Sequence, residues 1–150
     1  IRTLYAIEQV ESVATGFANA AVLWLLLLFD QEESRRLLHL AIQQSNEDGS
    51  TYAIASVAKR CALLQDIDSA KDCLARAEEH ATDVYDWCDL ADAWAAIFSD
   101  DERTRWSLEQ GERVIESRRD GNELSWHYRS LLGDKVAAAR CTRIARKKNG

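Results

Sequence analysis

The side chains best able to do chemistry in this chain are its three histidines and its paired carboxylates. No two histidines have the i, i+4 spacing, with a glutamate beside the first, that places two imidazoles and a general base on one helix face. Only six glycines occur, and they form neither a GxSxG turn nor a phosphate-binding loop. Acidic pairs such as residues 78–79 and 100–101 are common at solvated helix ends. We therefore expect a protein that is not an enzyme, with no cofactor and no metal.

The four cysteines offer no clearer chemistry. Cys61, Cys73 and Cys141 coincide with apolar positions of the pattern described below, and Cys88 lies one place beside it. None belongs to a CxxC pair, and no histidine stands at ligand spacing from any of them. The pattern predicts free cysteines that act as small apolar residues. Free thiols favour a cytoplasmic location.

The elements that must position any functional group are amphipathic helices. The stretch from 52 to 81 carries two apolar stripes at helical spacing, separated by a few residues around Asp66. The first stripe consists of Ile54, Val57, Ala58, Cys61 and Leu64, and the second of Ala70, Cys73, Leu74 and Ala77. So short a turn predicts an antiparallel helix hairpin, which needs neighbours stacked on both sides to cover its apolar faces.

The same two-stripe pattern recurs along the chain with a period near 34. Equivalent positions are spaced 34, 36, 34 and 34 residues apart at Leu4, Leu38, Leu74, Leu108 and Thr142. We expect helix hairpins over 16–44, 51–81, 84–117 and 121–148, with residues 1–12 as the second helix of an incomplete hairpin. Turn-forming residues predict loops at 45–50 and 119–122.

These repeats resemble the tetratricopeptide (TPR) family. That family places large, leucine, small and aromatic residues along its first helix, as in Trp87, Leu90, Ala91 and Trp94 of this chain. In the preceding copy, Ala70, Leu74 and Ala77 follow the family's spacing for the second helix. The resemblance implies an all-α fold, a right-handed α-solenoid of about four antiparallel helix hairpins. It covers residues 1–150 as a single TPR-like repeat domain, which we expect to be a fragment of a longer chain.

Composition supports a soluble protein. The chain is 47% hydrophobic and 29% charged, which is a globular balance. It has neither an apolar run of the roughly 20 residues that span a bilayer nor a secretion signal at its start. From Lys135 onward there are six basic residues and no acidic one. This end either contacts nucleic acid or an acidic surface, or is a solvated last helix. The net charge of −6 argues against nucleic acid as a partner.

In TPR-like arrays the first helices of successive hairpins line a concave groove that holds a protein or peptide. The resemblance implies these candidate partner-binding residues: Tyr52, Lys59, Tyr85, Asp92, Trp126 and Arg129. Aromatic residues and arginine are the usual anchors of protein interfaces. The alternative for each is packing against a neighbouring hairpin. The Lys, Asn and Arg set with which some members of the family grip a C-terminal carboxylate is absent.

A second surface is suggested by the uninterrupted apolar run from Ala20 to Phe29. Trp24, Leu26 and Leu27 lie off its main stripe, so they either pack within the array or against a preceding segment, or they form a self-association surface. The sequence thus predicts a non-catalytic interaction scaffold. The alternatives are a self-associating assembly module and a regulatory, substrate-binding array attached to an enzyme outside this sequence.

Overall fold

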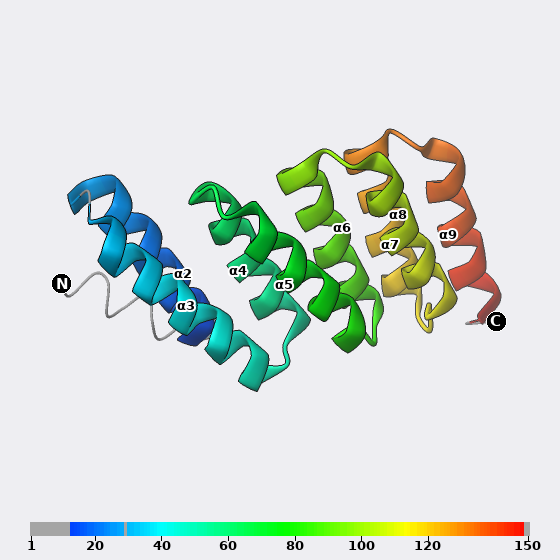
Figure 1. Ribbon diagram of the computed structural model, residues 1–150. Helices are drawn as coiled ribbons and strands as arrows, with labels where there is room; N and C mark the ends of the chain where they lie inside the picture. Colours follow the sequence, from blue (N-terminus) through cyan, green and yellow to red (C-terminus); the bar gives the residue numbers. More distant parts are fainter. Residues whose placement is uncertain (1–12, 29, 149–150) are drawn as a thin grey trace. The chain divides into compact units, whose positions relative to one another are not determined.

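The computed structural model describes residues 13–28 and 30–148, and within these ranges every regular element is helical (Figure 1). This confirms the prediction of an all-α protein. The helix expected within residues 1–12 lies outside the described part of the chain. The chain divides into two compact units, Ile1–His80 and Ala81–Gly150.

Each unit contains two helix hairpins. The first unit comprises α2 (Val13–Leu23), the short π-helix η1 (Trp24–Leu28), α3 (Gln31–Asp48), α4 (Thr51–Leu63) and α5 (Ile67–His80). The second unit comprises α6 (Val84–Phe98), α7 (Asp101–Arg113), α8 (Arg118–Leu132) and α9 (Lys135–Lys148). These elements correspond to the four hairpins expected from the periodicity, with shifted ends.

The two units repeat one packing pattern. Consecutive helices pair as α2 with α3 and α4 with α5 in the first unit, and as α6 with α7 and α8 with α9 in the second. The first helix of each second hairpin, α4 or α8, also packs on both helices of the hairpin before it. Since one helix partner leaves part of an apolar face uncovered, this third contact completes the burial of α4 and α8.

The predicted stripes form the cores of both units. Ile54, Val57, Leu74 and Leu108 are fully buried, and Leu38 is nearly so. Burying a side chain of this size stabilises a fold by about 1.5–3 kcal/mol. The 34-residue period therefore marks positions that face the interior.

The four cysteines are all free and buried. For Cys61, Cys73 and Cys141 this confirms the prediction. Cys88 was expected beside the stripe, but it is 2% exposed. It belongs to the core of the second unit, which also contains Leu124 and Cys141, because α8 and α9 close over this side of α6.

Aspartate and serine side chains cap the N-termini of several helices. The carboxylate of Asp83 accepts a hydrogen bond from the backbone N–H of Asp86 at 2.9 Å, and the carboxylate of Asp86 accepts one from the backbone N–H of Asp83. Single caps of the same kind are formed by Asp30, Ser50 and Asp100. Such a cap stabilises a helix by about 0.5–2 kcal/mol because it satisfies an otherwise unpaired N–H.

The predicted loop at 45–50 is wrong in extent, since α3 continues to Asp48. Ser45 is buried, and its hydroxyl donates to the carbonyl oxygen of Ile42 at 2.9 Å. Gly49 ends the helix with φ of 62°, and its N–H donates to the carbonyl oxygen of Ser45. The turn-forming residues therefore mostly occupy the last turn of the helix.

The predicted break at 119–122 is also wrong. α8 begins earlier, at Arg118, where Ser117 and Asp120 form a reciprocal capping box. Gly121 lies inside the helix, and it permits a close approach instead of a turn. A Cβ atom at this position would lie 2.4 Å from the Cβ of Ala145 and 2.9 Å from the carbonyl oxygen of Cys141.

We expect Gly121→Ala to destabilise the second unit, because the added methyl group meets two groups of α9 that are not flexible. Overpacking costs about 1–3 kcal/mol, and the better helix propensity of alanine, about 1 kcal/mol, offsets only part of it. Urea unfolding followed by circular dichroism measures the change. Asn122→Ala is the matched control, since it brings the same propensity gain at an exposed neighbour. A variant at Gly121 as stable as the one at Asn122 would contradict the close approach.

Candidate interaction surfaces

The predicted groove residues of the first unit lie on one face of α4. Tyr52 is 53% exposed, and Lys59, two turns further along, is partly exposed. The neighbouring Arg60 donates through Nε to the side-chain oxygen of Asn19 on α2 at 2.6 Å. This bond links the first helices of the two hairpins. Tyr52 therefore remains exposed to solvent, on a helix whose position is held by its contacts with α2 and α5.

The predicted groove residues of the second unit differ in exposure. On α8, Trp126 is 59% exposed and Arg129 is exposed, whereas Tyr85 and Asp92 on α6 are partly buried. The guanidinium of Arg119 lies over the Tyr85 ring at 5.5 Å. The Tyr85 hydroxyl is buried and has no hydrogen-bond partner among the described residues. Tyr85 therefore contributes to packing between α6 and α8, and the freely exposed anchors are Trp126 and Arg129.

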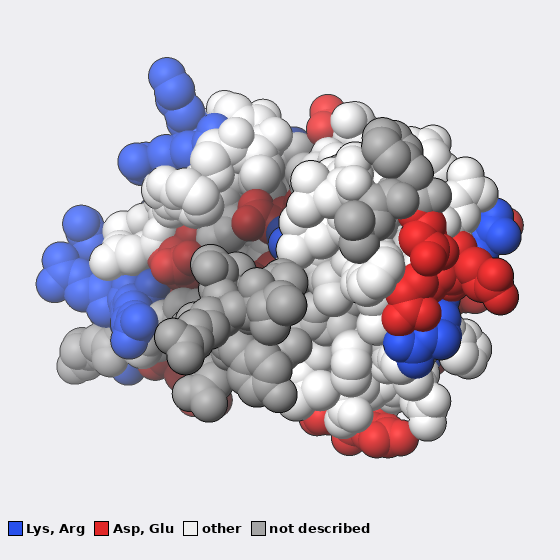
Figure 2. All heavy atoms as spheres, turned by 90° about the vertical axis from the view of Figure 1, so that its left-hand side faces the viewer, with Lys and Arg blue, Asp and Glu red and all other residues white. Residues whose placement is uncertain are grey.

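The second predicted surface lies on the π-helical turn η1, a geometry often found at functional sites. Leu26 is 64% exposed, Leu27 is 69% exposed and Trp24 is 37% exposed. Figure 2 views the molecule from the side on which α2 and α3 lie in Figure 1, and its right-hand part shows a broad area without charged side chains, with acidic and basic side chains together at the right-hand margin. Packing among the described residues leaves these three side chains in contact with solvent.

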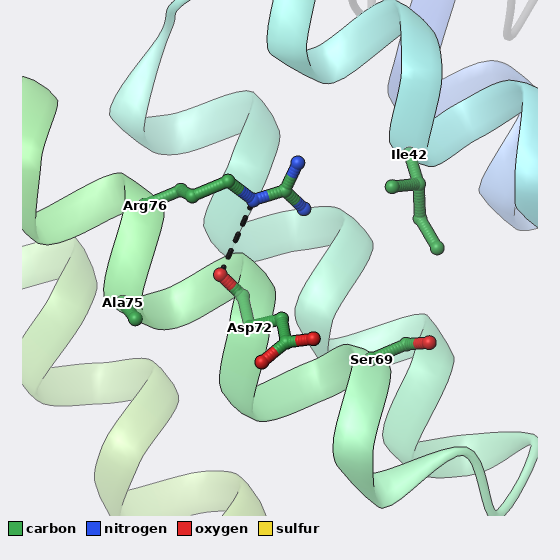
Figure 3. Close-up of a pocket in the computed structure, with 5 residues that line it drawn as sticks. All are labelled: Ile42, Ser69, Asp72, Ala75 and Arg76. Atoms are coloured by element: carbon green, nitrogen blue, oxygen red, sulfur yellow. Dashed lines mark hydrogen bonds between the residues drawn. The ribbon is translucent and has the colours of Figure 1, made fainter.

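A hollow of about 480 Å³ opens in the first unit and is lined by Ile42, Ser69, Asp72, Ala75 and Arg76 (Figure 3). Its one cationic group is already engaged. Arg76 donates to the backbone oxygen of Asp72 at 3.2 Å, to the side-chain oxygen of Asn46, and to the Cys73 sulfur at 3.2 Å. With one bond from each of its three nitrogens made in this way, Arg76 serves to hold α5 against α3.

Cys73 is nevertheless in an unusual position. Its thiol lies against that of Cys61, and a hydrogen bond from Cys61, aided by Arg76, lowers the pKa of Cys73 against the effect of burial. The same hydrogen bond, together with burial, raises the pKa of Cys61. Both side chains are fully buried. Buried thiols without solvent access are inert, so this pair is a feature of the core.

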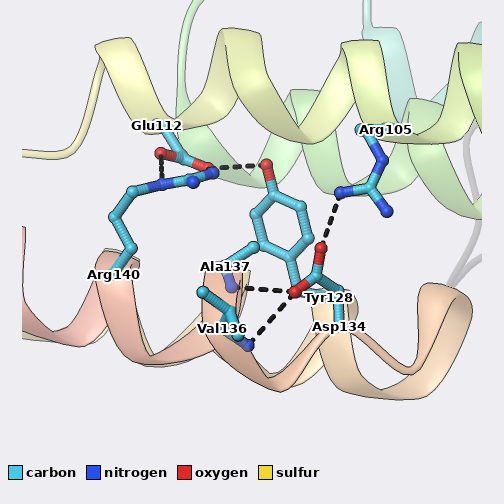
Figure 4. A network of polar contacts seen from close by, with 7 residues as sticks. All are labelled: Arg105, Glu112, Tyr128, Asp134, Val136, Ala137 and Arg140. Atoms are coloured by element: carbon cyan, nitrogen blue, oxygen red, sulfur yellow. Dashed lines mark hydrogen bonds and ion pairs between the residues drawn. The ribbon is translucent and has the colours of Figure 1, made fainter.

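A polar network ties the two hairpins of the second unit together (Figure 4). The Glu112 carboxylate on α7 accepts from the Tyr128 hydroxyl at 2.6 Å and from two nitrogens of Arg140, at 2.8 and 2.6 Å. Arg105 donates to Asp134 at 2.6 Å, and Asp134 also accepts from the backbone of Ala137 at 2.9 Å. Polar and charged groups from α7, α8, α9 and the connection between α8 and α9 thus satisfy one another.

Protonation of Glu112 is strongly influenced by this network. Burial alone raises the pKa of Glu112, but hydrogen bonds from Arg140 and Tyr128 outweigh it and hold that pKa below its ordinary value of 4.5. Burial, and then the hydrogen bond to Glu112, raises the pKa of Tyr128. The carboxylate is 13% exposed, so these bonds form in a partly desolvated place. Glu112 is therefore kept ionised and Tyr128 protonated, which are the forms in which the hydroxyl donates to the carboxylate. This bond has a structural role, because it connects α7 with α8.

The described residues contain no group of three or more His, Cys, Asp or Glu side chains arranged to hold a metal ion. None of the helices in this part of the chain is long and apolar enough to cross a membrane. Comparisons with models of protein families, with curated proteins and with solved structures found no match. The arguments for function therefore rest on the surfaces above.

We expect Glu112→Gln to lower the free energy of unfolding by about 1.5–3 kcal/mol at neutral pH, the usual worth of hydrogen bonds to a charged group. Because the folded-state pKa of Glu112 is depressed, this stabilisation is present above its ordinary pKa and is lost as the pH falls through the folded value. Urea unfolding at a series of pH values should show the two proteins converging in acid.

The control is Glu109→Gln, an exposed change on the same helix α7 that should cost less than about 0.5 kcal/mol. An equal loss in the two variants, or a difference independent of pH, would show that the Glu112 network does not stabilise the fold.

Proposed function

We propose that this chain is a TPR-like protein-binding scaffold whose hairpins stack as a right-handed solenoid. The 34-residue period and the third helix contact repeated within each unit support this assignment. Both are properties of arrays in which every hairpin covers part of its neighbour. The fold class does not itself define a function, so the proposal depends on the surface that the first helices present.

The observation that carries the proposal is the exposure of large aromatic side chains on α4 and α8. Tyr52 and Trp126 are each more than half exposed, although both rings are surrounded by helices with well-buried stripes. Aromatic side chains of this kind supply much of the binding energy at protein interfaces, because they bury a large area at a low cost in conformational entropy. We propose that each of them anchors a protein or peptide on the groove face of its own unit.

The test is a pull-down from a nuclease-treated lysate of the source, comparing the native chain with a Tyr52→Ser, Trp126→Ser variant. Loss of an interface anchor typically costs about 2 kcal/mol or more, so a captured partner should fall about 30-fold or more in affinity. Circular dichroism verifies the fold of each protein, and titration with the purified partner gives the affinity.

Val136→Ser is the matched control, because Val136 is 80% exposed but lies on α9, a second helix. It should retain the partner. If the double variant binds as well as the native chain, the groove is not the binding surface. If the native chain captures no protein, the scaffold proposal fails.

A second candidate function, self-association, is favoured by the exposure of Leu26 and Leu27. The two leucines are neighbours on one helical turn, and each is more than 60% exposed. Apolar surface is unfavourable in water, so burying it against a second copy stabilises the association by about 25 cal/mol for every Å² of apolar surface covered. The π-helical backbone of η1 presents both side chains on the outside of the first unit.

We expect the native chain to show a mass that rises with concentration in sedimentation velocity, and Leu26→Ser, Leu27→Ser to remain a monomer over the same range. Val136→Ser again serves as the control, since it removes an exposed apolar group at a different place. A native chain that is monomeric at every concentration would exclude this function for the chain as it stands.

A further inference from the structure

Charge is divided sharply between the two hairpins of the second unit. The hairpin α6–α7, residues 84–113, carries three basic and eight acidic residues. The hairpin α8–α9, residues 118–148, carries nine basic and three acidic residues, a net charge of +6. The total of −6 for the whole chain hides this separation. A local surplus of this size attracts anions even on an acidic protein.

The surplus lies on the outside of the hairpin because its three carboxylates each lie against a donor or a ring within the second unit. Asp120 accepts from the backbone N–H of Ser117 at 2.8 Å, and Asp134 pairs with Arg105. Glu123 lies 3.7 Å from the His127 ring. The acidic residues of the hairpin are partly buried, and the most exposed positions of α8 and α9 include none of them. The charged residues at those exposed positions are Arg118, Arg119, Arg129, Lys135, Arg140, Arg143, Arg146, Lys147 and Lys148.

Three of these arginines converge on one place. A hollow of about 320 Å³ between α8 and α9 is lined by Arg129, Arg143 and Arg146, together with Ala139 and Thr142. Arg140, by contrast, is occupied by Glu112. Within the described residues, the three arginines around the hollow have no carboxylate partner. Guanidinium groups form bidentate bonds with carboxylates and phosphates, so this arrangement suits a ligand with more than one negative charge.

An exposed aromatic side chain adjoins the hollow. Trp126 precedes Arg129 by three residues on α8, so the two side chains are neighbours on the helix surface. Trp126 is 59% exposed, and its ring meets the His127 ring edge to face at 4.7 Å. This contact supports one edge of the indole and leaves the remainder open to a ligand.

We propose that the Arg129, Arg143 and Arg146 hollow binds an acidic segment of a protein partner, with an apolar residue of that segment resting on Trp126. This inference rests on the scaffold function and names the chemistry of its partner. Acidic motifs are recognised by arginine clusters, and the adjacent indole adds apolar contact that a simple anion would not use.

A peptide fits this surface better than a nucleic-acid strand. A strand carries one phosphate for every nucleotide and needs a basic path along its length. Here α8 also packs on α6 and α7, whose hairpin carries eight acidic and three basic residues, so a strand that continued beyond the arginines would meet a net negative surface. A short acidic segment places its charges only where the arginines are.

The experiment uses fluorescence anisotropy with the fluorescein-labelled peptide Glu-Glu-Leu-Glu-Glu as the probe. Arg143→Glu, Arg146→Glu should weaken its binding by about tenfold or more, or 1.4 kcal/mol at the least. Lys135→Glu, Lys147→Glu makes the same change in net charge at exposed positions of α9 outside the hollow lining, and it should weaken binding by less than about threefold.

A second comparison tests the indole. Trp126→Ala should weaken binding of the leucine probe by about three- to tenfold, while a probe with glycine in place of leucine should bind the native chain and this variant equally. A probe with glutamine in place of every glutamate should not bind. Circular dichroism again verifies the fold of each variant.

Three results would overturn the inference: no binding of the acidic probe to the native chain, equal weakening by the two charge reversals, or stronger competition by an oligothymidine than by unlabelled peptide. Failure of the scaffold function remains distinguishable. A lysate partner that is retained by Arg143→Glu, Arg146→Glu leaves the scaffold intact and contradicts the acidic segment. Absence of any captured partner, with the probe still bound, contradicts the scaffold alone.

Discussion

The close approach of helices at small residues is the constraint on which both hairpins of the second unit depend. At Gly121 there is no room for a side chain, because Ala145 and the backbone of Cys141 already occupy the space. Gly111 has a similar place on α7, where an added Cβ would lie 2.9 Å from Leu124. Since protein interiors are packed as densely as crystals, helices that touch at such points have little freedom to rotate or slide. The side chains on their outer faces are thereby held in defined positions.

This packing explains which parts of the fold were predictable from the sequence. Apolar stripes and a constant period identify the faces that must be buried, and Leu74 and Leu108 are buried as the period requires. Helix ends were less predictable, because the same residue types serve several purposes. The serine and aspartate residues at 45–48 suit a loop or a last helical turn equally well, and only the burial of Ser45 distinguishes them. A glycine such as Gly121 signals a turn or a close contact, and the difference lies in a residue 24 positions away.

The candidate surfaces show the same division. Exposure of Tyr52 and Trp126 follows from helical periodicity, since each lies opposite a buried stripe. Tyr85 was assigned to the groove by the same spacing, but Arg119 on a different helix covers it. The Glu112 network had no sequence signal at all, because Arg140 is 28 residues away and neither residue belongs to a motif. Tertiary contacts between charged groups depend on the register of two helices, which a periodicity does not determine.

Pairing within the fold also decides which charges remain for a partner. Electrostatic attraction between oppositely charged groups is strongest where water is excluded, and the Glu112 carboxylate of α7 is engaged in such a place. Glu112, Asp120 and Asp134 have lowered pKa values because each is engaged in hydrogen bonds within the unit. These carboxylates therefore interact with groups of the fold itself, while the exposed arginines of α9 remain available to a partner in solution. The hairpin α8–α9, with nine basic and three acidic residues, thereby presents a basic surface on a chain whose net charge is negative.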